Sequence, residues 1–422
     1  MRRSSILLAA TAVFTMVLAA PVQAASGRLD KSFSGNGKQT QFPKGATGYS
    51  VAIDKQGRIL VAGYTLTAKT DLALARFLPN GKPDPDFGKG DGRVTTNLGA
   101  TDYGFDVALQ ADGKIVVVGE RDFNDHSQFA VVRYGIRGVL DKSFSKDGMN
   151  FTEFNKKYQG ANAVAISPTG DIIVGGYTSN GSTSRWALAR YRPNGSLDPR
   201  FGKGGKVTTD VSPTVEQIED IALVPGGRIV VGGYAESSLT PRFAIGQYGS
   251  GGKLDRSFGH DGVTTVDVTK GGDTAYGLAR QRDGKLILVG YVSRGGAGDW
   301  GIVRFGPKGR LDKGFGTKGQ VVTAFGPAYD YAYGVAIQPN GRIVVVGRAT
   351  GDTSDFGVVR YKPGGGLDKG FGRDGKVLTN FDQGDDLARG VALQSNGKIV
   401  VAGVAGVAKN TFRIALARYL NT

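Results

Sequence analysis

Residues 331–371, YAYGVAIQPNGRIVVVGRATGDTSDFGVVRYKPGGGLDKGF, are the stretch of sequence that decides the fold. This stretch holds an alternating apolar run, a Pro-Asn-Gly turn, a continuous apolar run ending in glycine, a variable loop, a third apolar run and a glycine-rich connector. Each run is too short for a buried helix and is rich in valine and isoleucine, so all three are predicted to be strands. The same pattern recurs along most of the chain.

The recurrence has a nearly constant period, which is the mark of a repeat array. The connector closes on a phenylalanine every 54 to 57 residues, at Phe33, Phe87, Phe144, Phe201, Phe258, Phe315 and Phe371. A fourth short strand follows each connector, as at Lys376–Thr379. Four antiparallel strands of this length form one blade of a propeller, and several such blades close into a ring. The seven copies therefore predict an all-β fold, a seven-bladed β-propeller.

The two ends of the chain predict how the ring closes. The repeats begin with a connector and a lone fourth strand, from Leu29 to about Phe42, and they stop after a third strand at residues 415–419. These fragments complete one blade only if residues 38–42 pair with residues 415–419, which would also remove two open sheet edges. An alanine recurs in the first strand of every copy, and a small residue suits the innermost strand: Ala52, Ala108, Ala165, Ala222, Ala279, Ala336 and Ala392.

Three units recur within each copy: Leu-Asp-x-x-Phe-Gly, then Asp/Asn-Gly-Lys/Arg-Ile-Val-Val-x-Gly, then Arg-Tyr-x-x-x-Gly. Together they resemble the bacterial delta-60 repeat family of β-propellers over about residues 29–422. The resemblance implies a propeller fold and a secreted or surface-associated protein, and it carries over no catalytic residue. The departures are small, since Pro83-Asp84 replaces Leu-Asp in the second connector and Gln247 replaces the third-strand arginine in the fourth copy.

The N-terminus reads as a targeting segment. Arg2 and Arg3 precede an apolar segment at residues 6–20 and a small-residue site at residues 21–24, which predicts a secretory signal peptide at residues 1–24. Residues 25–422 are then the propeller, and we expect it to be secreted, periplasmic or at the cell surface. The apolar segment is shorter than the ~20 residues of a membrane-spanning helix, so no membrane span is expected. The chain has no cysteine, which excludes disulfides.

The charge and the metal-binding residues set bounds on partners and cofactors. The net charge is +16, and removal of Arg2 and Arg3 leaves +14. Such a surface favours polyanions in general, including a cell-surface polyanion, although solubility also explains it. We expect a monomer with no specific nucleic acid partner. Two histidines and no cysteine argue against a dedicated zinc or copper site, and we expect no cofactor other than calcium.

Candidate site residues stand where the copies differ, at one mouth of the central channel. Six residues before the repeated alanines, five copies have acids: Asp102, Glu216, Asp273, Asp330 and Asp386. Three residues before the same alanines stand Tyr49, Phe105, Asn162, Glu219, Tyr276, Tyr333 and Arg389. Acids beside aromatic rings suit a sugar, and the oxygens of Asp273, Asp330 and Asp386 suit calcium. The alternative is that each acid accepts hydrogen bonds within its own turn and each ring packs on its neighbour.

Two functions from different classes fit this sequence. The first is a secreted, non-enzymatic binding or scaffold propeller that recognises a ligand, a glycan or a protein at one channel mouth. The second is a polysaccharide hydrolase or lyase that uses rim carboxylates, two of which would have to lie ~5–10 Å apart for hydrolysis. No catalytic residue is assigned, and the residues of a quinone-dependent dehydrogenase are missing. The recurrent connector aspartate and third-strand arginine, such as Asp368 and Arg360, are assigned to structure because nearly every copy has them.

Overall fold

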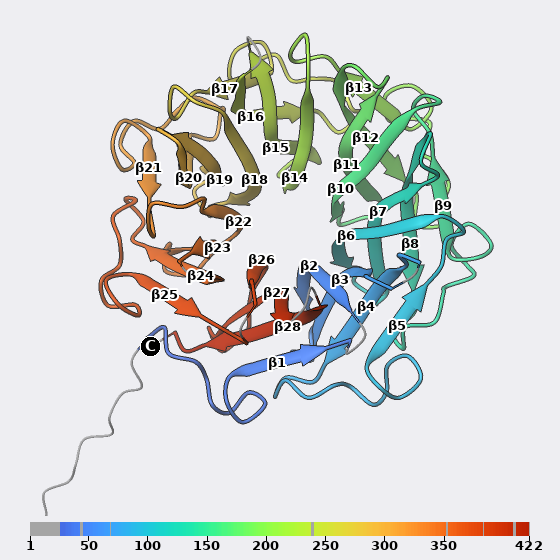
Figure 1. The fold of residues 1–422 in the computed structure, drawn as a ribbon. Coiled ribbons are helices and arrows are strands. Elements are labelled where there is room, and N and C mark those ends of the chain that lie inside the picture. Colours follow the sequence, from blue (N-terminus) through green and yellow to red (C-terminus); the bar gives the residue numbers. More distant parts are fainter. Residues whose placement is uncertain are drawn as a thin grey trace, which may run out of the picture.

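The computed structural model describes residues 26–42, 45–67, 69–237, 240–351, 353–382, 384–407 and 411–421. The predicted signal peptide at residues 1–24 lies outside these residues. In the described part of the chain the strands form seven four-stranded antiparallel sheets, arranged as blades around a central channel (Figure 1). The predicted all-β, seven-bladed propeller is thereby confirmed. The described residues hold no helix that is long and apolar enough to cross a membrane.

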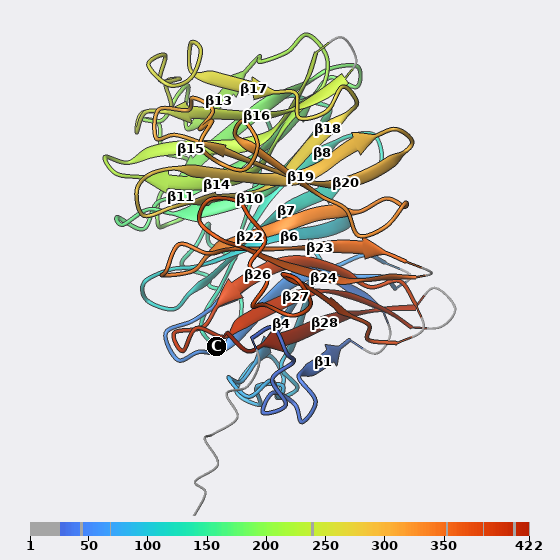
Figure 2. The ribbon, with the colours of Figure 1, turned by 90° about the vertical axis from the view of Figure 1, so that its left-hand side faces the viewer.

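Each blade is named here by its order along the chain, and its strands run from the channel outward. The first three blades are β2 (Ala46–Ile53), β3 (Ile59–Thr65), β4 (Leu72–Phe77) and β5 (Arg93–Thr96); β6 (Thr101–Leu109), β7 (Ile115–Asp122), β8 (Ser127–Tyr134) and β9 (Met149–Thr152); and β10 (Tyr158–Ile166), β11 (Ile172–Ser179), β12 (Ser184–Tyr191) and β13 (Lys206–Thr209). Figure 2 shows the ring from its side, with the connecting loops gathered at its two faces.

The remaining blades repeat this order. They are β14 (Glu216–Val224), β15 (Arg228–Ser237), β16 (Thr240–Tyr248) and β17 (Val263–Val266); β18 (Asp273–Arg280), β19 (Leu286–Arg294), β20 (Ala297–Phe305) and β21 (Gln320–Thr323); β22 (Tyr331–Ile337), β23 (Ile343–Thr350), β24 (Ser354–Tyr361) and β25 (Lys376–Thr379); and β26 (Leu387–Leu393), β27 (Ile399–Val407), β28 (Thr411–Tyr419) and β1 (Lys38–Gln41).

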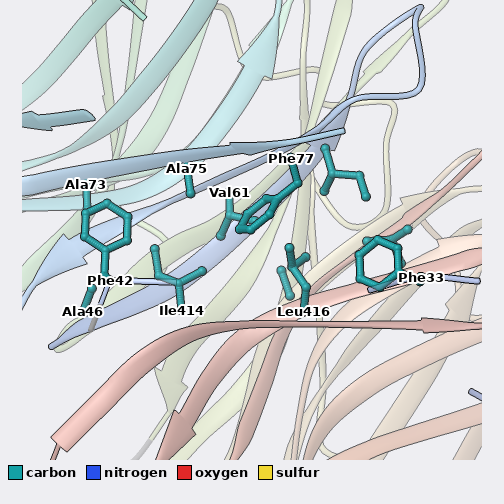
Figure 3. Packing of buried hydrophobic residues seen from close by; sticks show 12 residues of the cluster. Phe33, Phe42, Ala46, Val61, Ala73, Ala75, Phe77, Ile414 and Leu416 are labelled. Carbon is teal, nitrogen blue, oxygen red and sulfur yellow. The ribbon is translucent and has the colours of Figure 1, made fainter. Parts of the chain in front are cut away.

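The ring closes where the two ends of the chain meet in the last blade. Strand β1 pairs with β28 in antiparallel register, from Lys38 opposite Ala417 to Gln41 opposite Ile414. The predicted closure is confirmed, with one difference at its edge. Phe42 is not part of the strand, because its backbone turns at a positive φ of 65° and its buried side chain joins the seam between the last and first blades. Figure 3 shows this seam, where Phe42 lies with Ala46, Ile414 and other apolar residues.

The recurrent arginine and aspartate pair within their own blade, and the arginine also contacts the next blade, which the sequence did not predict. In the sixth blade, Arg360 Nε donates to Asp368 Oδ2 at 2.9 Å, and Arg360 Nη1 donates to Asn421 Oδ1 in the next blade at 2.6 Å. Arg304 makes the equivalent contacts with Asp312 and with the carbonyl of Pro363. These contacts account for the repeated pair without any role in binding.

Candidate functional site

A β-bulge in each innermost strand puts one side chain per blade at the channel. The pairing of every innermost strand with the second strand of its blade shifts by one residue, for example between Gly48 and Ser50 in β2. Such a bulge bends the strand and re-aims the extra residue. We call the seven extra residues the bulge ring: Tyr49, Phe105, Asn162, Glu219, Tyr276, Tyr333 and Arg389.

The glycine that recurs in the second strand makes room for this bulge. A Cβ on Gly347 would lie 1.9 Å from the carbonyl oxygen of Tyr331, two residues before the bulge residue Tyr333. The other copies have the same close approach, at 1.8 to 2.0 Å, at Gly63, Gly119, Gly176, Gly233, Gly290 and Gly403. Only glycine permits a carbonyl so near its Cα. The repeated glycine and the bulge ring are therefore two parts of one structural feature.

Five consecutive members of the bulge ring form a continuous arc, in which Arg389 lies between two pairs of aromatic rings. The ring centroids of Tyr276 and Tyr333 lie 5.1 Å apart, and those of Tyr49 and Phe105 lie 5.3 Å apart. Between these pairs, the Arg389 guanidinium lies 3.9 Å from the centroid of Tyr49 and 4.9 Å from that of Tyr333. These separations lie within the usual range for aromatic and cation–π contacts. Asn162 and Glu219 complete the ring with polar groups.

The bulge ring borders a cavity of about 380 Å³ in the channel. All of its members line this cavity, together with Asp106, Gln217 and Asp220 among others. Cavities that hold small molecules in proteins measure roughly 300–1,000 Å³ and combine apolar walls with a few polar groups. This cavity has both properties, and it is therefore the candidate site.

Polar side chains connect the innermost strands on one side of the cavity. Asp106 accepts from Ser50 Oγ at 2.6 Å and from the amide of Val164 at 2.8 Å, so it joins three successive blades. Asp220 accepts from the amides of Ile221 and Leu278, each at 2.7 Å. Burial raises the pKa of Asp106 to about 6 and, with the nearby charge of Asp106, that of Asp220 to about 7.

Glu219 presents a carboxyl group to the cavity. Burial, together with the charge of the neighbouring Asp220, raises the pKa of Glu219 to about 8, and Arg389 acts in the opposite direction. A carboxyl group with this pKa is mostly protonated at neutral pH, so it can donate as well as accept a hydrogen bond.

The structure separates the predicted site residues into two groups. Tyr49, Phe105, Tyr276 and Tyr333 lie together at the cavity. The acids Asp102, Glu216, Asp273, Asp330 and Asp386 do not line it, and each has 0% exposure. Each acid accepts hydrogen bonds from backbone amides of a nearby loop, as Asp273 does from Val268 at 2.7 Å and Thr269 at 2.9 Å. This is the turn-forming arrangement that the sequence left open as the alternative.

The predicted calcium candidates follow the same arrangement. Asp330 accepts from the amides of Phe325 at 2.9 Å and Thr350 at 2.7 Å. Asp386 accepts from the amides of Phe381 at 2.7 Å and Gly406 at 3.1 Å. Among the described residues, no group of three or more histidine, cysteine, aspartate or glutamate side chains is arranged to hold a metal ion.

Sequence reasoning missed a second set of residues near the cavity. The residue after the repeated glycine is aromatic or charged in most copies, and four of these residues contact or electrostatically influence a member of the bulge ring: Tyr64, Tyr177, Tyr234 and Arg348. Tyr64 Oη lies 3.3 Å from Tyr49 Oη. Tyr291 stacks on Tyr331 with ring centroids 4.8 Å apart, and Tyr331 stacks on Tyr333 at 5.9 Å. Alignment of the copies on that glycine would have identified this set.

One family model matches parts of six of the seven copies. A family model described as "Domain of unknown function (DUF5122) beta-propeller" matches residues 57–87, 110–144, 167–201, 281–315, 338–371 and 394–422. The chain is a β-propeller repeat protein. The matched stretches leave out the fourth copy, in which Gln247 replaces the arginine. No curated protein matches the sequence.

Solved structures share the propeller fold at low sequence identity. One is virginiamycin B lyase from Staphylococcus aureus, in a catalytically inactive form with quinupristin, which is 11% identical at a TM-score of 0.51, with 90% of this chain and 98% of that chain covered. Another is polysaccharide lyase Uly1, which is 12% identical at a TM-score of 0.50, with 95% of this chain and 98% of that chain covered. At such identities the likeness shows the fold alone.

Proposed function

We propose that this propeller is a secreted, non-enzymatic binding protein of the delta-60 type that recognises a glycan at its channel cavity. The single observation that carries the proposal is the arc formed by Tyr276, Tyr333, Arg389, Tyr49 and Phe105. Aromatic walls with a small number of polar groups are what a sugar ring requires, since its apolar face packs on rings and its hydroxyl groups need partners. Asn162, Gln217 and Glu219 border the same cavity and supply such partners.

Secretion after removal of residues 1–24 and a monomeric state belong to this proposal. A glycan outside the cell is a partner that a secreted propeller would meet. The net charge of +14 without Arg2 and Arg3 supports an attraction to cell-surface polyanions at long range. Calcium at Asp273, Asp330 and Asp386 is a weaker proposal, because each carboxylate already accepts backbone hydrogen bonds.

Binding of glycans by the mature protein, residues 25–422, tests the proposal. A glycan array identifies the ligand, and calorimetry then compares the protein with its Tyr49→Ala and Tyr333→Ala variants. Each substitution should weaken binding about five- to tenfold, because one ring contact contributes on the order of 1 kcal/mol. Tyr158→Ala is the control, because Tyr158 is also an innermost-strand tyrosine, at the start of β10, and does not line the cavity. Absence of glycan binding, or equal binding by all variants, would reject the proposal.

A polysaccharide lyase or hydrolase is the second candidate, and one observation favours it. The only cavity carboxyl groups in the described chain belong to Asp106, Glu219 and Asp220, and the pKa of Glu219, raised to about 8 by burial, suits a general acid or base near neutral pH. The enzyme would thus use Glu219 and not the rim acids. Incubation with acidic and neutral polysaccharides, followed by assays for new reducing ends and for unsaturated sugars, distinguishes the two. Formation of product by the wild-type protein, and its loss in the Glu219→Gln variant, would favour the enzyme over the binding protein.

A further inference from the structure

Arg389 differs from the recurrent arginines in having no anionic partner. Arg360 pairs with Asp368 at 2.9 Å, and Arg304 pairs with Asp312 at 2.9 Å. Within the described residues, the Arg389 side chain forms no ion pair with a carboxylate, and its Nε is buried without a hydrogen-bond partner. Its side chain borders the channel cavity.

Two tyrosines pack against Arg389 and leave its N–H groups as the means of binding a partner. Arg389 Cζ lies 3.9 Å from the ring centroid of Tyr49 and 4.9 Å from that of Tyr333. The N–H groups of a guanidinium lie in its plane and form a fork that matches the two oxygens of a carboxylate or the oxygens of a sulfate. A ligand group would therefore meet Arg389 edge-on, from the cavity.

In the described structure, no carboxyl group of the cavity forms an ion pair with Arg389. Asp106 and Asp220 face the same cavity, but backbone amides and Ser50 already donate to their carboxylates. Glu219 is within electrostatic reach of Arg389, yet no hydrogen bond joins the two in the described structure, and burial keeps the Glu219 carboxyl mostly protonated at neutral pH. A partly buried cation without a partner is costly, and an anionic ligand would remove that cost.

We propose that the channel site takes an anionic saccharide whose carboxylate or sulfate group is bound edge-on by Arg389, while its sugar ring lies against Tyr49 and Tyr333. This inference rests on the proposed glycan-binding function and adds the class of glycan. The oxyanion is the shared chemistry of a uronic acid and a sulfated sugar. Arg389 is then the residue that determines specificity for acidic over neutral saccharides.

Calorimetry with three series of oligosaccharides of equal length tests the inference. The series are uronic acid oligomers, sulfated galactose oligomers and neutral glucose oligomers, each titrated into the mature protein and its variants. An acidic series should bind about 10- to 100-fold more tightly than the neutral series, because charge-assisted hydrogen bonds to a fork are strong. Arg389→Gln should remove this difference by weakening the binding of the acidic series by a much larger factor than that of the neutral series, and Arg389→Lys should restore part of it. The tighter of the two acidic series identifies the oxyanion.

The outcomes separate this inference from the proposed function. If no saccharide of any series binds, the proposed function fails and the inference fails with it. If the neutral series binds as tightly as both acidic series, and Arg389→Gln alters the affinity for none of the three, the proposed function stands and the inference is overturned. Thermal melting of each variant establishes whether loss of binding reflects loss of folding. A folded Arg389→Gln variant that keeps its preference for acidic oligomers would also overturn the inference.

Discussion

The carbonyl oxygen of Tyr331 lies against Gly347, at a point where a Cβ on that glycine would be 1.9 Å away. This contact is a consequence of the bulge at Tyr333, and it recurs in all seven blades. A larger residue would therefore have to push the innermost strand away from the second strand. The position of the cavity side chains thus depends on a residue that does not line the cavity.

Substitution of Gly347 by alanine should disturb both stability and the site. We expect Gly347→Ala to lower the free energy of unfolding by about 1–3 kcal/mol or more, because the added methyl group meets backbone atoms that must shift. Binding at the cavity should weaken as well, since Tyr333 would be displaced. Denaturant unfolding is the measurement. Gly364→Ala is the matched control, because a Cβ at Gly364 meets no atom within 4 Å. Equal stability of the two variants would contradict this account of the bulge.

The buried carboxyl groups near the channel predict how stability changes with pH. The pKa of Asp220 is about 7 in the folded protein, raised by burial, and Asp106 follows in the same direction at about 6. Unfolded aspartate has a pKa of about 3.9, so the folded protein holds protons that the unfolded chain releases. Stability from these groups is complete below about pH 4 and is lost as the pH rises through their folded pKa values.

Urea unfolding should therefore give a lower free energy of unfolding at about pH 8 than at about pH 5. Asp220→Asn should reduce this difference, because the substituted side chain has no proton to release. Carboxyl groups whose pKa is lowered in the folded protein have the opposite effect, because the stability that they contribute is lost as the pH falls. Burial alone would raise the pKa of Asp30, but hydrogen bonds from Lys398 and Ser32 lower it to about 2. A wild-type profile that is flat or rises between these two pH values would refute the prediction.

At the scale of the strand, the innermost strands contact one another in two ways. In the fifth, sixth and seventh blades the residue after the bulge is glycine, and a Cβ on Gly277 or Gly334 would lie 2.6 Å or 2.7 Å from a backbone oxygen of the next blade. Between the first and fifth blades, the side chains of Asp106, Asn162 and Asp220 make the connections instead. Within the bulge ring, only the third and fourth blades have uncharged amide or carboxyl side chains, Asn162 and Glu219, and the other five blades have the four aromatic residues and Arg389.

The sequence was sufficient for the strands, their order and the closure, because each depends on a pattern repeated in every copy. It was also sufficient to place Tyr49 and Tyr333 at equivalent positions. It could not show that Asp273 turns into its own loop, since a carboxylate six residues before the alanine is compatible with either direction. The cavity acids Asp106 and Asp220 were missed because only two copies have aspartate there, so repetition gave no signal.

The fourth blade offers a test of the arginine that joins neighbouring blades. Gln247 Nε2 donates to Asp255 at 2.7 Å, as the arginines do in their own blades. Arg304 also donates to the carbonyl of Pro363, 59 residues ahead, at 2.6 Å. Gln247→Arg should add such a bond to the carbonyl of Pro307 and raise the free energy of unfolding by about 1 kcal/mol, whereas Arg304→Gln should lower it by at least as much. Urea unfolding of both variants is the measurement, and no change in either would contradict the assigned role.

At the scale of the whole molecule, the ring is held by contacts between residues far apart in sequence. Arg418 in the last blade pairs with Asp30 at 2.8 Å and also donates to the carbonyl of Pro79 in the first blade. Ile414 and Leu416 from β28 pack with Val61 and Phe77 in the seam (Figure 3). An open stack of repeats has only nearest-neighbour contacts, so damage at one end stays near that end. A closed ring transmits the same damage to both sides of the seam.

Truncation after Gly406 should therefore destabilise the entire protein. The truncation removes β28, which is the partner of β1. This strand contains the seam residues Ile414 and Leu416 and also Arg418. We expect a melting temperature roughly 10 °C lower or more, because several kcal/mol of buried contacts are lost at once. Hydrogen exchange should also accelerate in β15 of the fourth blade, which lies across the ring from the seam (Figure 1). Removal of Thr422 alone is the control. A truncated protein that melts within a degree or two of the parent, or whose faster exchange is confined to the first and last blades, would show that closure does not hold the ring.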